Sequence, residues 1–198
     1  MLTDEKINRI RQLIRYDNIA AVVIPSSDPH QSEYIAEHWQ ARKWLTGFSG
    51  SAGTAVITLE HAILWTDFRY YIQAPKQIKG SIFELYKMGE PDVPDFEKYL
   101  AETLKSGDTI GIDGNLFSMI KVKKYKTMFK DRGILLNSNI DFIKPLWKDR
   151  PPIPVSKAFS FSKKYAGQSR VEKLEQIRDR MDDAGASFHL MATLDDIE

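Results

Sequence analysis

The sequence of 198 residues contains no cysteine. This absence excludes disulfide scaffolds, cysteine nucleophiles and zinc sites built from thiolates. No apolar run approaches the roughly 18 residues of a membrane-spanning helix. The N-terminal segment MLTDEKINRIRQLIRYDN is too highly charged for a secretory signal peptide. We therefore expect a cytoplasmic protein with no membrane segment.

The sequence also lacks an excess of charge of either sign. Its 28 Lys and Arg residues oppose 27 Asp and Glu residues, giving a net charge of +1. No overall field therefore draws the protein toward nucleic acid or an anionic membrane. The densest basic run, KVKKYK at 121–126, is typical of the solvated face of a helix. We expect neither nucleic acid nor a membrane as a partner.

What the sequence does contain is an alternation of apolar strands and amphipathic helices. Two of the apolar runs, 54–59 and 62–66, are separated by Glu60 and His61 and predict a hairpin. This interleaving predicts an α/β fold in which a mixed β-sheet is flanked by helices on both faces. The other strands are expected at 19–25, 81–88, 109–113 and in GILLN, and helices around Ile7, Ile10 and Ile14, at 94–104 and in SMIKVKKYKTMFKD.

Proline marks the end of this pattern. Four prolines fall within the segment KPLWKDRPPIPV (144–155), and such a density disfavours both helix and sheet. We expect a stiff linker and a domain boundary there. The predicted organisation is a first domain at 1–150, a linker at 151–168 and the start of a second domain at 169–198.

The C-terminal segment repeats the N-terminal one. At a shift of 167 residues, Ile7 corresponds to Leu174, Ile10 to Ile177 and Ile14 to Met181; Arg11 and Asp28 likewise correspond to Arg178 and Asp195. In both places an amphipathic helix precedes an apolar strand, the second being ASFHLMAT (186–193). Many α/β units look alike, but a second copy of the domain, cut off after its first helix and strand, explains the agreement better.

The small-residue loop GFSGSAGT (47–54) is the most conspicuous motif. It has no lysine for a phosphate-binding P-loop, no GxGxxG for a dinucleotide and no GxSxG for a nucleophile elbow. We interpret it as structural, with small residues that allow two backbones to approach closely before the strand at Thr54.

Candidate chemical groups are few. The four histidines, His30, His38, His61 and His189, are far apart and form no metal-binding motif, so we expect no metal site in this chain. Asp67 and Arg69, in WTDFRYY, follow an apolar strand, which is where α/β folds place functional groups. Asp67 at such a junction is more often a helix N-cap, whereas an arginine beside aromatic residues can bind a carboxylate or carbonyl.

Three motifs together resemble the N-terminal part of the Xaa-Pro aminopeptidases (aminopeptidase P), of the creatinase/prolidase group of pita-bread metallopeptidases. They are IPSSDPHQSEYIAEHWQARKWLTGFSGSAGTAVIT, WTDFRYYIQA and LWKDRPPIP, and they agree in order and spacing. The long form of this family has two related N-terminal domains before the catalytic domain, which agrees with the repeat inferred above.

The resemblance implies hydrolysis of the bond between an N-terminal residue and a following proline. Two metal ions, typically manganese, activate the water, and their ligands belong to a C-terminal domain that is absent here. It also implies a peptide with proline at the second position, the chain's own C-terminal catalytic domain and a second copy in a homodimer as partners. The family arginine of WTDGRY, which contacts the peptide, corresponds to Arg69. Phe68 replaces the glycine of that motif.

Two other functions remain open at this stage. The first is a non-catalytic protein-binding module, since the large subunit of the histone chaperone FACT uses a similar fold without peptidase chemistry. The second is a dipeptidase related to prolidase, which normally has one N-terminal domain; the second repeat argues against it. The leading hypothesis is a non-metal-binding part of an Xaa-Pro aminopeptidase that positions the peptide and assembles the oligomer, and that is inactive on its own.

Overall fold

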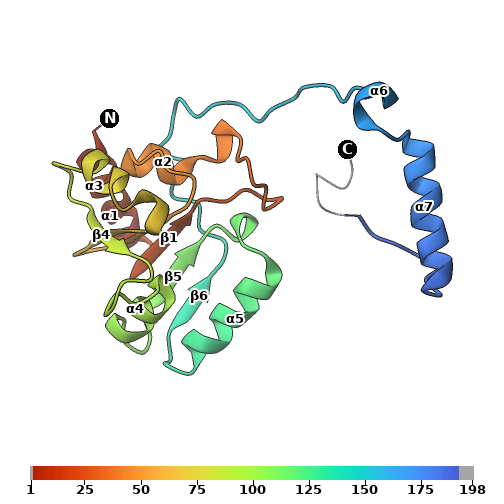
Figure 1. The fold of residues 1–198 in the computed structure, drawn as a ribbon. Helices are drawn as coiled ribbons and strands as arrows, with labels where there is room; N and C mark the ends of the chain where they lie inside the picture. Colours follow the sequence, from red (N-terminus) through yellow and green to blue (C-terminus); the bar gives the residue numbers. More distant parts are fainter. Residues whose placement is uncertain (1, 192–198) are drawn as a thin grey trace. The chain divides into compact units, whose positions relative to one another are not determined.

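A computed structural model describes residues 2–191. The chain divides into two compact units, Met1–Ile153 and Pro154–Glu198, each of which is described by itself (Figure 1). Within residues 2–191, no helix is both long enough and apolar enough to cross a membrane.

A six-stranded mixed sheet organises the first unit. Its strand order is β4-β3-β2-β1-β5-β6. The strands are β1 (Ala21–Pro25), β2 (Thr54–Thr58), β3 (Ala62–Thr66), β4 (Glu84–Lys87), β5 (Thr109–Ile112) and β6 (Leu135–Asn137). Strand β2 pairs antiparallel with both β1 and β3, whereas the β3–β4, β1–β5 and β5–β6 pairs are parallel.

The predicted hairpin joins β2 to β3. The hydroxyl of Thr58 accepts hydrogen bonds from the backbone N–H groups of Glu60 and His61, at 3.2 and 2.8 Å, and these bonds close the turn. All five residues of β3 are buried, because helices cover both faces of the sheet. The strand expected at 81–88 is shorter and covers only Glu84–Lys87, at one edge of the sheet.

One face of the sheet is covered by α1 (Thr3–Tyr16), α2 (Ala41–Thr46) and α3 (Gln73–Gln77). The helical spacing of Ile7, Ile10 and Ile14 places them on one side of α1, where each is fully buried against the sheet. Leu45 of α2 joins the same core.

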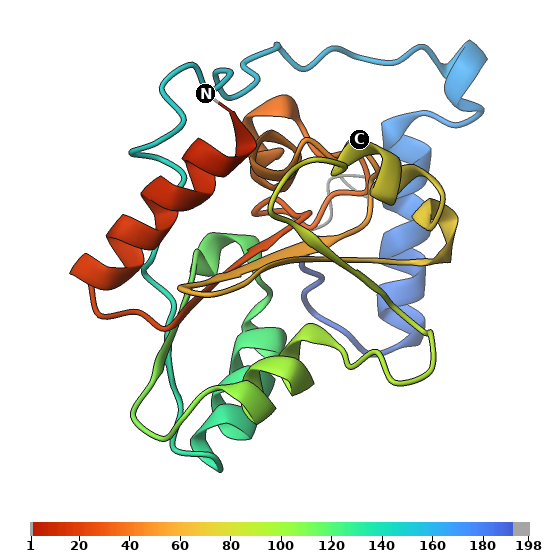
Figure 2. The ribbon, with the colours of Figure 1, turned by 90° about the vertical axis from the view of Figure 1, so that its left-hand side faces the viewer.

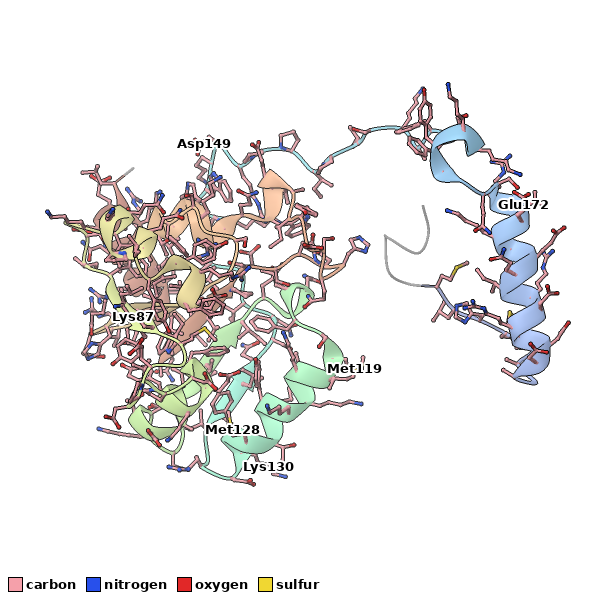
Figure 3. All side chains as sticks on the ribbon, in the orientation of Figure 1. Lys87, Met119, Met128, Lys130, Asp149 and Glu172 are labelled. Carbon is pink, nitrogen blue, oxygen red and sulfur yellow. The ribbon has the colours of Figure 1, made fainter. Side chains whose placement is uncertain are left out.

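The opposite face carries α4 (Phe96–Thr103) and α5 (Met119–Lys130), as Figure 2 shows. Phe129 of α5 and Trp65 of β3 are almost fully buried in this second core. The α/β class with helices on both faces is therefore confirmed. Met119 and Lys130 mark the two ends of α5 in Figure 3. The lysines of KVKKYK are exposed, as expected for a solvated face.

The proline-rich segment begins on the first unit. Trp147 is 8% exposed and stacks on Trp44 with ring centroids 5.2 Å apart. The Arg150 Nε donates to the backbone oxygen of His38 at 2.7 Å, and the His38 ring contacts the oxygen of Pro151 at the same distance. The chain therefore stays attached to the first core through Pro151, and residues 151–162 carry neither helix nor strand.

The second unit contains α6 (Lys163–Ala166) and α7 (Arg170–Asp183). The bounds of α7 equal those of α1 shifted by 167 residues, so the helix predicted by the repeat is present. Its C-terminal end repeats as well, because Ala186 N–H donates to Met181 at 2.8 Å as Ile19 N–H donates to Ile14 at 2.9 Å.

The strand expected at 186–193 is not formed where the structure describes it. Residues 186–191 follow α7 without regular structure, and the last two positions, like Asp195, lie outside the described residues. A strand needs a partner strand for its backbone hydrogen bonds, and residues 186–191 have none.

Candidate functional site

Arg69 lies at the C-terminal end of β3, in the short 3-10 helix η2 (Phe68–Tyr70). Asp67 is the N-cap of that helix, as expected for its position, and accepts from the Arg69 N–H at 3.1 Å. Its carboxylate also accepts from Arg69 Nε at 3.0 Å and Nη2 at 2.7 Å. These hydrogen bonds from Arg69 lower the pKa of Asp67 below its usual value.

The Asp67–Arg69 pair is a surface feature. The side chains of Arg69 and Asp67 are 53% and 26% exposed, so the guanidinium reaches solvent while its orientation is fixed. Phe68 does not disturb this geometry: in the described chain the non-glycine residues with positive φ are Asn18, Gln31 and Asp92, so Phe68 adopts an ordinary backbone conformation. The substrate role of Arg69 stays a prediction.

The loop 47–53 is built as a structural element, in agreement with its interpretation from sequence. A Cβ on Gly53 would lie 2.9 Å from the backbone oxygen of Trp65, so only glycine permits this approach to β3. A Cβ on Gly50 would lie 2.2 Å from the ring of Phe48. Ser51 Oγ and the Tyr70 hydroxyl, 2.8 Å apart, join this loop to η2.

Arg42 holds the loop in place and was missed from the sequence. Its Nε donates to Ser26 Oγ at 2.9 Å, and its two terminal nitrogens donate to the backbone oxygens of Phe48 and Gly50. The side chain is almost completely buried, and burial lowers the pKa of Arg42 to about 10, so it stays charged at neutral pH. The sequence offered one sign of this buried arginine, because Arg42 lies between two apolar residues of α2, Ala41 and Leu45, that are both in the core.

A cavity of about 240 Å³ opens beside Arg42 and the loop. The tryptophans nearby have separate roles, since Trp39 lines this cavity whereas Trp44 packs against the first core. The cavity is assembled from segments distant in sequence, namely 25–26, 33–35, 39–43 and 49–51.

The histidines do not come together. His61 Nδ1 contacts Glu84 at 2.8 Å at the surface, and His38 contacts Pro151. Within residues 2–191, no group of three or more His, Cys, Asp or Glu side chains has the geometry to hold a metal ion. The described residues therefore do not fit a dinuclear metal centre.

Two family models match the chain. Both describe the creatinase/prolidase N-terminal domain; one covers residues 6–139 and the other residues 149–198. The second match begins close to the boundary between the two compact units.

Similar proteins include curated aminopeptidases. The chain is 39% identical over 202 residues to aminopeptidase P2 of Arabidopsis thaliana, and the match covers 100% of this chain and 28% of that protein. It is 34% identical over 197 residues to a probable Xaa-Pro aminopeptidase P of Laccaria bicolor, covering 98% of this chain and 30% of that protein. The chain thus spans less than a third of the length of these relatives.

A solved structure similar to this chain is the X-prolyl aminopeptidase of Caenorhabditis elegans, described as a cytosolic enzyme with a di-nuclear active site. It has a TM-score of 0.84 and 29% identity, and the match covers 93% of this chain and 32% of that one. An aminopeptidase P from Streptococcus thermophilus, 21% identical with a TM-score of 0.53, shares the fold over 73% of this chain and 97% of that one.

Proposed function

Because the chain belongs to the creatinase/prolidase N-terminal domain family, we propose that it is the N-terminal part of an Xaa-Pro aminopeptidase. The whole enzyme removes an N-terminal residue that precedes proline. In this proposal residues 1–150 form the first N-terminal domain, 151–168 the linker and 169–198 the start of a second, related domain. The chain helps to position the peptide and to assemble a homodimer.

The metal chemistry belongs elsewhere in this proposal. The ligand groups of residues 2–191 do not form a metal centre, so no step is assigned to a metal held by this part of the chain. A C-terminal catalytic domain supplies two divalent ions, manganese or a similar metal. The description of the Caenorhabditis elegans relative as cytosolic and dinuclear supports a cytoplasmic enzyme of this type.

The proposed role in positioning the peptide rests on Arg69. Of its five N–H groups, two donate to Asp67, and the other three have no acceptor among residues 2–191. The bidentate pair fixes the guanidinium, so the remaining donors are already oriented when a peptide carbonyl or carboxylate arrives. The aromatic ring of Tyr70, 5.3 Å from the guanidinium carbon, supports it from one side.

Arg69→Lys in the full-length enzyme tests this role. Lysine keeps the charge but loses the fork of donors and with it a charge-assisted hydrogen bond to the peptide, so kcat/KM should fall about 10- to 100-fold. The melting temperature should hardly change, because the site is exposed. Arg9→Lys, at an exposed position of α1, is the matched control. A lower melting temperature with unchanged kcat/KM would show that Arg69 only clamps the end of β3.

The 198-residue chain alone should neither bind manganese tightly nor cleave Xaa-Pro peptides. The measurement is release of the N-terminal residue from a peptide with proline at its second position, with and without added Mn²⁺. Metal-dependent release by the purified chain contradicts the proposal. Light scattering of the full-length enzyme tests the homodimer, and a monomeric mass rejects it.

A further inference from the structure

The cavity beside Arg42 has the features of a small-molecule site. Its volume of about 240 Å³ is below the roughly 300 Å³ at which pockets for drug-sized ligands begin. At about 30 Å³ for each water in the liquid, it has room for about eight waters. An occupant is therefore a small molecule of on the order of ten non-hydrogen atoms, since bonded atoms take up less space than separate waters.

Two cationic side chains line the cavity. Arg42 uses three of its N–H groups on Ser26, Phe48 and Gly50, and its other two have no acceptor among residues 2–191. It makes no ion pair with any described carboxylate. Lys43 lines the same cavity and donates to the neutral side chain of Gln40 at 3.0 Å. Two positive charges thus border the cavity without a carboxylate partner in the described chain, an arrangement that a bound carboxylate would relieve.

The rest of the lining is acidic and apolar. Glu33 borders the cavity, is exposed, and makes no side-chain hydrogen bond or ion pair with residues 2–191. Ile35 and Trp39 add apolar surface to the lining. A phosphate or another purely anionic ligand would meet the Glu33 carboxylate, whereas a ligand with both an ammonium and a carboxylate group matches a lining that carries both signs of charge.

We propose that this cavity binds a free α-amino acid with an apolar side chain. The carboxylate lies toward Arg42 and Lys43, the ammonium toward Glu33, and the side chain against Ile35 and Trp39. Leucine, with nine non-hydrogen atoms, has the required size and charges. This inference concerns binding only, so it holds or fails independently of the peptidase function proposed above.

Calorimetric titration of the 198-residue chain with three ligands tests the proposal. L-leucine carries both charged groups, 4-methylpentanoate lacks the ammonium, and isopentylamine lacks the carboxylate. Leucine should bind, and each truncated ligand should bind about 5-fold more weakly, the upper end of what the loss of one partly exposed charge pair costs. No heat from leucine, or equal affinity for all three ligands, overturns the proposal.

Surface variants then locate the site without disturbing the buried Arg42. In Glu33→Gln the advantage of leucine over 4-methylpentanoate should disappear, and in Lys43→Gln leucine should bind about 5-fold more weakly. Glu37→Gln and Lys79→Gln, at exposed positions that do not line the cavity, are the matched controls and should bind leucine as the unaltered chain does. Unchanged binding in both cavity variants, or equal loss in the controls, rejects this site.

Discussion

Replacing the buried Arg42 with lysine should destabilise the first unit by about 3 kcal/mol. Arg42 donates to three acceptors on separate segments, Ser26, Phe48 and Gly50. A lysine ammonium is a single point and cannot reach all three, so at least two charge-assisted hydrogen bonds are lost. At about 1.5–3 kcal/mol each, their loss sums to about 3–6 kcal/mol, and partial hydration of the freed groups favours the lower end.

Urea unfolding at pH 7, followed by tryptophan fluorescence, measures this loss. With an m-value of about 2 kcal/mol/M, the midpoint should fall by about 1.5 M urea, and the melting temperature should fall by about 6–12 °C. Arg9→Lys, which makes the same chemical change at an exposed position, should stay within about 0.5 kcal/mol of the unaltered chain. If Arg42→Lys unfolds at the same urea concentration as Arg9→Lys, the guanidinium does not hold the loop and the reasoning is wrong.

Three further predictions concern stability. Gly50→Ala should cost about 2–3 kcal/mol in urea unfolding, because the new Cβ meets the fully buried ring of Phe48. Gly47→Ala, with open space but a φ of +73°, should cost only about 1 kcal/mol, and equal losses would contradict the packing argument. Trp147→Ala should cost about 3–5 kcal/mol, because Trp147 is buried against the first core, and an unchanged midpoint would show that this segment is not part of it. Glu172 lies in the first turn of α7 (Figure 3), and hydrogen bonds, first from Lys163 and then from Ser169, lower its pKa from 4.5 to about 2. The stability that the ionised Glu172 gives to α7 is therefore complete above about pH 4.5 and is lost as the pH falls through 2. NMR shifts of the Ser169 and Glu172 amides should follow this titration, and a midpoint near pH 4.5 would refute it.

Local patterns in the sequence predicted most of the fold. The spacing of Ile7, Ile10 and Ile14 identified α1, because helix periodicity and burial agree there. The hairpin of β2 and β3 followed from two apolar runs and a short polar turn. The strand at 81–88 was predicted too long, since an edge strand pairs only as far as its one neighbour extends. The apolar run after α7 formed no strand in residues 186–191, since strand formation depends on a partner.

The sequence predicted only those features of the site that depend on residues close together in the chain. Asp67 as an N-cap followed from its position after a strand, and the Gly53 approach from the small residues before Thr54. The Arg42 contacts and the cavity were not predictable, because they bring together Ser26, Glu33 and the loop 49–51, whose proximity exists only after the sheet has formed. Whether Arg69 contacts a peptide remains a prediction carried by the family resemblance.

The strand order also determines when each part of the sheet can assemble during synthesis. Strands β1 to β4 are the first four strands in chain order and lie next to one another in the sheet, so they can pair as soon as residue 87 has left the ribosome. Strand β5 joins β1 from the other side, and until residue 112 is made the backbone of β1 offers an open edge to other chains. Both edges of the very apolar β2–β3 hairpin are paired, by β1 and β4, once residue 87 is made, so we expect aggregation of nascent chains to begin at β1 rather than at the hairpin.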